Sequence, residues 1–131
     1  MIGLDTNVLV RYIMQDDPRQ SSKATVLVES LDAHTPGFVG VVSLIELYWV
    51  LTSCYALTNE QVGRALGLLL RTKHLVVERA DQVPRALRTF ETGKADFADC
   101  LIERTATSAG CHKTMTFDGN AAKHAGMTLI R

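Results

Sequence analysis

Cysteine is scarce in this chain of 131 residues, and its three copies follow no disulfide or metal-binding pattern. Cys54, Cys100 and Cys111 are odd in number, unrelated in spacing, and lie inside or beside apolar segments. Such a set excludes a disulfide framework and a zinc site built on cysteine. We therefore expect three buried free thiols and a cytoplasmic protein.

Long hydrophobic runs and a net charge are also missing. No segment reaches about 18 consecutive apolar residues, and the first residues lack a basic region followed by an apolar core, so we expect neither a membrane span nor a secretory leader. Lys and Arg together number 14, as do Asp and Glu, which argues against binding a polyanion by bulk charge alone. An apolar content of 47% suffices for one core, so we expect a single domain over residues 1–131.

Short apolar runs alternate with segments of helical periodicity along the whole chain. The runs that we predict as strands are residues 2–4, 38–42, 75–77, 113–117 and 127–130, and the predicted helices are residues 8–14, 17–33, 43–55, 58–70, 81–92, 96–109 and 119–125. This alternation predicts an α/β fold with a mostly parallel central sheet of about five short strands and helices on both faces.

Acidic side chains occur where predicted strands end or predicted helices begin. These acids are Asp5, Glu46, Asp96, Asp99 and Asp118. Because the carboxyl ends of parallel strands meet at one edge of a sheet, we expect the five to converge there. If they do, the remaining surface is net basic, which suits an acidic pocket on a protein that works on a polyanion.

Each acid also has a purely structural explanation. Asp5 helps to cap the first helix, where Thr6 or Asn7 is the expected cap, and Glu46 follows Ser43 at the spacing of a capping box. Asp96 and Asp99 gain from the dipole of the helix that they begin, and Asp118 before a glycine suits a turn. Five such coincidences at one edge are less probable than one site.

Clustered carboxylates limit the chemistry that the site can perform. They cannot all stay ionised without a compensating cation, because mutual repulsion raises their pKa values. Hard oxygen ligands select Mg²⁺ or Mn²⁺, and the histidines, His34, His74, His112 and His124, share no spacing that indicates zinc. One or two such ions activate water and stabilise the leaving oxygen in phosphodiester cleavage.

Four segments, in order and spacing, resemble the motifs of PIN-domain ribonucleases, specifically the VapC toxins of toxin-antitoxin pairs. They are Asp5-Thr6-Asn7 after an apolar strand, Ser43-Leu44-Ile45-Glu46, Ala95-Asp96-Phe97-Ala98-Asp99 and Thr116-Phe117-Asp118. The resemblance spans the whole chain and implies a single, three-layer PIN domain. It also implies an endoribonuclease that depends on Mg²⁺ or Mn²⁺ and acts on structured cellular RNA.

The same resemblance assigns roles to individual residues. The positions that match Asp5, Glu46, Asp99 and Asp118 are catalytic, metal-binding acids in that family, and Asp96 belongs to the same metal pocket. Those that match Asn7 and Thr116 support the acids by hydrogen bonds, and we place Thr6 and Ser43 in the same supporting group. Glu103 departs from the family pattern, which has a small residue there, and we expect it to be peripheral.

Partners follow from the resemblance and from the apolar helices. VapC toxins are dimers held inactive by a VapB antitoxin. The helices over residues 43–55 and 66–70 carry more apolar surface than one small sheet covers, which suggests a homodimer and an antitoxin groove. We expect the antitoxin to place a basic side chain, an arginine, among the acids.

Three other functions fit this sequence less well. A response-regulator switch needs a pair of acids after the first strand and an aspartate after the third, where this chain has Val76-Val77-Glu78. A phosphatase of the haloacid dehalogenase type needs Asp-x-Asp, where the chain has Asp5-Thr6-Asn7. A non-catalytic PIN-like binding module has no need of an intact set of acids.

Overall fold

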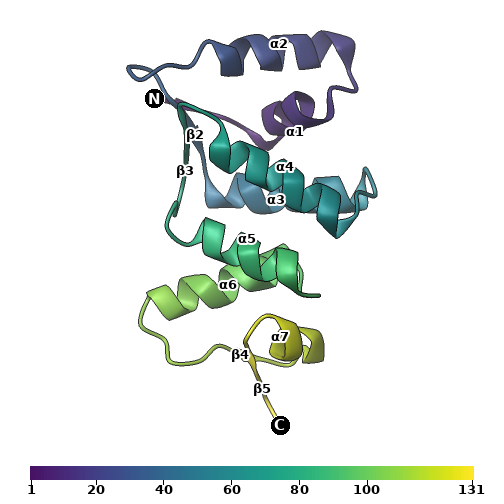
Figure 1. The fold of residues 1–131 in the computed structure, drawn as a ribbon, viewed down its shortest axis with the longest axis vertical. Helices are drawn as coiled ribbons and strands as arrows, with labels where there is room; N and C mark the ends of the chain where they lie inside the picture. Colours follow the sequence, from purple (N-terminus) through teal and green to yellow (C-terminus); the bar gives the residue numbers. More distant parts are fainter. The chain divides into compact units, whose positions relative to one another are not determined.

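The computed structural model describes residues 1–131, which form two compact units, Met1–Glu78 and Arg79–Arg131 (Figure 1). The first unit holds β1 (Ile2–Gly3), α1 (Thr6–Met14), α2 (Pro18–Glu29), β2 (Gly37–Val39), α3 (Val41–Ser53), α4 (Asn59–Arg71) and β3 (Leu75–Val77). The second holds α5 (Val83–Thr92), α6 (Phe97–Ser108), β4 (Met115–Thr116), α7 (Gly119–His124) and β5 (Thr128–Leu129). The predicted α/β class with parallel strands is confirmed, and one domain over residues 1–131 stays a prediction.

Three short parallel strands form the sheet of the first unit, in the order β1-β2-β3. Ile2 pairs with Gly37, and Gly37 pairs with Leu75, so the carboxyl ends of the three strands lie at one edge. Val39 and Val77 are buried, as expected of strands covered by helices. Helix α1 packs against both α2 and α3, and α4 contacts α3 and β3 (Figure 1).

Two helices of the first unit begin where their capping sequences predict. The side chain of Asp17 accepts from the backbone N–H of Gln20, and Pro18 occupies the first turn of α2. Thr58 and Gln61 form both bonds of a capping box at the start of α4. Helix α2 ends at Glu29, earlier than the predicted residue 33, and Leu31 packs into the core beyond its end.

Helix α3 begins two residues earlier than predicted, which overturns the expected capping box. Its N-cap is Gly40, so Ser43 lies inside the helix and does not cap it. The first helical N–H, that of Val41, instead donates to Oε1 of Glu78 at 2.8 Å. Because Glu78 follows β3, the cap of α3 comes from the neighbouring end of the same sheet. The structural explanation of Glu46 as half of a capping box is therefore wrong.

The second unit is built on helices α5 and α6, which pack against each other. The predicted apolar stripe of α5, Val83, Ala86, Leu87 and Phe90, is buried as a whole. The ring of Phe90 meets that of Phe97 edge to face, with centroids 6.1 Å apart. On α6, helical spacing predicts a buried face of Ala98, Leu101, Ile102, Thr105 and Ala109. Leu101 is buried, but Ile102 is 54% exposed, and Phe97 and Cys100 take the other buried positions.

Strands β4 and β5 pair in parallel, with Met115 opposite Thr128 and Thr116 opposite Leu129. The five expected strands are thus present, hydrogen-bonded as a sheet of three and a pair. In a parallel sheet that helices cover on both sides, the central strands are buried on both faces. Met115 of β4 is exposed, so β4 is not buried in this way. None of the helices is both long and apolar enough to cross a membrane.

The cysteines differ in their surroundings, and the expectation that all three are buried is wrong for two of them. All three thiols are free, but Cys54 and Cys111 are exposed. Cys54 follows the last turn of α3, and Cys111 follows the glycine after α6, where an apolar neighbour in sequence does not ensure burial. Burial raises the pKa of the Cys100 thiol to about 11, helped by the charges of Asp96, Asp99 and Glu103, so this thiol stays protonated and inert.

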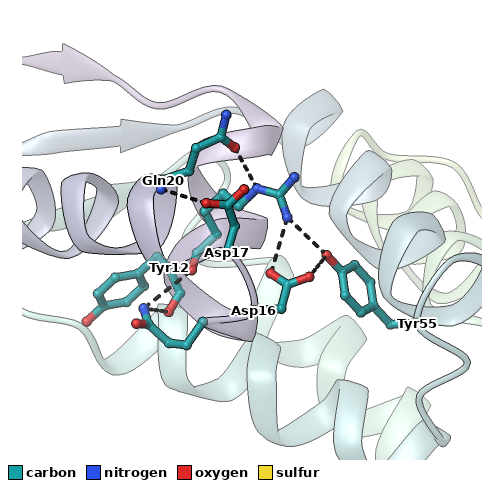
Figure 2. Close-up of polar contacts among 7 residues, drawn as sticks. Tyr12, Asp16, Asp17, Gln20 and Tyr55 are labelled. Carbon is teal, nitrogen blue, oxygen red and sulfur yellow. Dashed lines mark hydrogen bonds and ion pairs between the residues drawn. The ribbon is translucent and has the colours of Figure 1, made fainter.

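A polar network ties α1, α2 and the end of α3 together (Figure 2). Arg11 donates to Asp16 Oδ1 at 3.1 Å and to Gln20 Oε1 at 2.8 Å. The Tyr55 hydroxyl donates to Asp16 Oδ2 at 2.7 Å. This hydrogen bond and the Arg11 guanidinium hold the pKa of Asp16 below its ordinary value. The network fixes the loop between α1 and α2, and so the helix that begins beside Asp5.

We expect Tyr55→Phe to lower the denaturant midpoint at neutral pH, because the donor to Asp16 is lost. The folded state lowers the pKa of Asp16 below 3.8, so this contribution is present above that value and fades as the pH falls through the folded-state pKa. The gap between variant and wild type therefore narrows in acid. Denaturant unfolding followed by circular dichroism at neutral and acidic pH measures it.

Tyr12→Phe is the matched control, because only the backbone carbonyl of Tyr12 accepts a bond in this network, from Gln15 (Figure 2). A Tyr55→Phe loss that equals the Tyr12→Phe loss, or that stays constant with pH, contradicts the assignment.

Candidate active site

The first unit brings two of the predicted acids to the carboxyl edge of its sheet. Asp5 is the N-cap of α1, and its Oδ1 accepts from the backbone N–H of Thr6 at 2.8 Å. The Thr6 hydroxyl donates to Oε1 of Glu46 at 3.0 Å. Since Thr6 is the chain neighbour of Asp5, this bond holds the Glu46 carboxylate beside the end of β1. Asp5 and Glu46 are thus linked through one residue, Thr6, and their joint role in one site stays a prediction.

The sequence predicts that Thr6 or Asn7 caps α1, but the cap is Asp5. The hydroxyl of Thr6 instead positions the carboxylate of Glu46. The side chain of Thr6 is buried, with 7% exposed, while Asp5 and Glu46 are exposed. A buried hydroxyl with one fixed acceptor restricts the rotamers that Glu46 can adopt. Asp5 uses only Oδ1 for its cap, which leaves Oδ2 free to bind a cation.

The two other supporting residues of this unit make no bond to an acid. Asn7 is exposed in the first turn of α1 and lines a cavity of about 300 Å³ between α1 and α2. Ser43 is half-buried at the third position of α3. A supporting role for either residue stays a prediction.

The second unit gathers the other three acids. Asp96 is the N-cap of α6, and its Oδ1 accepts from the backbone N–H of Asp99 at 2.7 Å. This cap places the two carboxylates within one helical turn. Partial burial raises the pKa of Asp99 above its ordinary value, and the charges of Asp96 and Asp118 raise it further. The ionised form of Asp99 is therefore disfavoured where it stands.

Asp118, whose charge acts on Asp99, is held by three local bonds. It is the N-cap of α7, where its Oδ1 accepts from the backbone N–H of Asn120 at 2.8 Å and of Ala121 at 3.4 Å. The backbone N–H of Asp118 donates to Oγ1 of Thr116 at 3.0 Å, so Thr116 fixes the turn, while its support of the carboxylates stays a prediction. Oδ2 of Asp118 keeps no partner and is free for a ligand.

Glu103 bonds within its own helix and not to the other acids of this unit, and its peripheral role stays a prediction. Its Oε1 accepts from the Thr107 hydroxyl at 2.9 Å, one turn along α6. Its charge acts on the Cys100 thiol and not on Asp99. Glu103 therefore serves as a natural comparison for Glu46, because each carboxylate accepts from one threonine hydroxyl.

The donor chemistry of both groups fits a hard divalent cation, because every candidate ligand is a carboxylate oxygen. Neither unit by itself arranges three or more His, Cys, Asp or Glu side chains as a metal-binding group. Asp5 with Glu46, and Asp96 with Asp99 and Asp118, are thus two partial ligand sets. Their convergence into one site stays a prediction.

Comparison with known protein families gives one match. The model of the PIN domain matches residues 2–127, which span both groups of acids and nearly the whole chain. No curated protein matches the sequence significantly. The match agrees with the order of the motifs and with the parallel α/β elements described above. The chain therefore belongs to the PIN domain family.

Proposed function

We propose that this protein is an endoribonuclease dependent on Mg²⁺ or Mn²⁺ and the toxin of a type II toxin-antitoxin pair of the VapC kind. PIN domains are typically metal-dependent nucleases. The observation that carries the proposal is the gathering of Asp96, Asp99 and Asp118 by their own helix caps. The caps explain why Asp96 and Asp118 stand where they do, but not why a third carboxylate, Asp99, is kept beside them, and a cation would offset that repulsion.

Asp5, Glu46, Asp96, Asp99 and Asp118 are the residues that would hold the cation. When bound, a divalent ion supplies an activated water and stabilises charge on the leaving oxygen of the phosphodiester. The chain itself contributes positioning. Thr6 restricts the side chain of Glu46, and Thr116 fixes the turn that presents Asp118. The Oδ2 atoms of Asp5 and Asp118 could bind the cation without breaking a helix cap, because each cap uses only Oδ1.

The proposed substrate and partners set the place of action. Cellular RNA as the target puts the enzyme in the cytoplasm, and the exposed free thiols of Cys54 and Cys111 suit that reducing compartment. Phosphatase and phospho-switch functions lose support from the family match, since PIN domains are typically nucleases. A non-catalytic PIN-like module remains the competing proposal, and the cleavage assay separates the two.

We expect the purified protein to cleave RNA in the presence of Mg²⁺ or Mn²⁺, and we expect a chelator to abolish the cleavage. Asp5→Asn and Asp99→Asn should abolish cleavage, because each removes a charged ligand. Glu46→Gln should lower it by at least about tenfold, although the amide oxygen still accepts from Thr6 and the fold is retained. Gel analysis of a defined RNA, with thermal unfolding of each variant, measures both effects.

Glu103→Gln is the matched control for Glu46→Gln. It makes the same substitution at a carboxylate that also accepts from a threonine, here Thr107, and it should cleave at the normal rate. Cleavage that persists in chelator would contradict the proposed metal dependence. Normal cleavage by Glu46→Gln, with unshifted dependence on the ion concentration, would exclude Glu46 as a ligand.

Exposed apolar side chains of the first unit support the proposed homodimer. Val42 and Trp49 are 74% and 46% exposed and lie seven residues apart on α3, hence on one face. Leu68 on α4 is 46% exposed, while its neighbours Leu66 and Leu69 are buried. We propose that a second copy covers this surface and that a VapB-type antitoxin binds the toxin and places an arginine among the acids.

We expect light scattering to give a dimer at micromolar concentration and Val42→Asp to give a monomer, because the new charge opposes burial of the α3 face. Val26→Asp is the control, since Val26 is 69% exposed on α2, away from that face. A monomeric wild type contradicts the dimer. Expression of the protein should arrest growth, and co-expression of the antitoxin from a neighbouring gene should restore it. If co-expression fails to restore growth, the proposed antitoxin is contradicted.

A further inference from the structure

Phe117 is the most exposed of the large apolar side chains, with 82% of its surface accessible. It stands between Thr116 and Asp118, two residues of the candidate active site. Burying a phenylalanine in the core is among the larger single stabilising contributions available to a chain. This ring takes no part in the core, and it has no aromatic partner among the ring pairs of the protein.

The backbone on both sides of Phe117 is held in place. Thr116 pairs with Leu129 in the β4–β5 ladder, and its carbonyl accepts from the N–H of Ile130 at 2.8 Å. On the other side, Asp118 is fixed by its bond to Thr116 and by its cap on α7. The ring is therefore presented to solvent by a rigid turn, and its exposure is not the result of a loose loop.

The segment that carries Phe117 supplies exposed cations in addition to the acid Asp118. Residues 111–125 contain Lys113 and Lys123 but only one acid, Asp118, together with two histidines. Both lysines are exposed, and neither forms an ion pair in the structure. Proteins that bind single-stranded nucleic acid combine exposed aromatic rings, on which bases stack, with unpaired cations that meet phosphates, and this segment carries both.

We propose that Phe117 is a stacking platform for one unpaired base of the RNA, next to the phosphate that the acids process. This inference rests on the proposed ribonuclease function. Stacking on a ring is tolerant of base identity, so Phe117 would hold the strand in register at Asp118 without reading the sequence. It also predicts a preference for unpaired nucleotides at the cleavage point, because a base inside a duplex cannot reach the ring.

The experiment compares Phe117→Trp, Phe117→Leu and Phe117→Ala in steady-state cleavage of a loop-containing RNA. Stacking requires an aromatic ring, so we expect Leu and Ala to raise KM by about tenfold and Trp to keep the wild-type KM. The kcat should change much less than KM. All three variants should unfold as wild type does, since the side chain is exposed. Val26→Ala, an equally simple truncation of an exposed residue on α2, should change neither parameter.

A second RNA, with an abasic nucleotide beside the cleavage point, tests the contact itself. On this RNA the KM of wild type should rise by the same factor, and the KM of Phe117→Ala should rise no further than it does on the intact RNA. A wild-type KM in Phe117→Leu overturns the inference and leaves the ribonuclease proposal intact. A change of oligomeric state in the Phe117 variants overturns it too, because the ring then serves a contact between copies. Failure of wild type to cleave any RNA refutes the proposed function first.

Discussion

Repulsion among carboxylates that are fixed by their own helices is the constraint on which the account of this site depends. Asp96 caps α6 and so places Asp99 one turn away, while Asp118 caps α7 and adds its charge to the same neighbourhood. Neither Asp96 nor Asp118 can move away from Asp99 without losing its cap, which costs about 1 kcal/mol. Helix formation and charge repulsion therefore oppose each other, and the proposed cation would offset the repulsion.

Local patterns predicted those parts of the fold whose determinants are close together in sequence. The caps at Asp17 and Thr58 and the buried stripe from Val83 to Phe90 need only a few neighbouring residues. The start of α3 was missed because its cap, Glu78, lies 37 residues away. The bond from Thr6 to Glu46 spans 40 residues and was equally invisible. The caps formed by Asp5, Asp96 and Asp118 are local in sequence, whereas the partner of Glu46 needed the tertiary structure.

The structure also changes how the individual acids are understood. Asp5, Asp96 and Asp118 do serve as caps, so the structural and the functional explanations hold together and do not compete. A capping aspartate is rigid and keeps one oxygen for a ligand, which is an advantage in a metal site. Glu46 is different, because the capping box that would have explained it does not exist. Glu46 is therefore the acid whose position is least explained by helix capping, and its one bond is to the buried hydroxyl of Thr6.

Thermal unfolding of wild type and Asp99→Asn, each with and without Mn²⁺, tests the central claim most directly. Because the folded state raises the pKa of Asp99, this group favours folding below its ordinary value of 3.8 and opposes it once the pH exceeds the folded-state pKa. At neutral pH without metal, the account predicts that Asp99→Asn unfolds at a higher temperature than wild type. Mn²⁺ should then stabilise wild type far more than the variant. A metal-free variant less stable than wild type, or equal stabilisation of both by Mn²⁺, would contradict it.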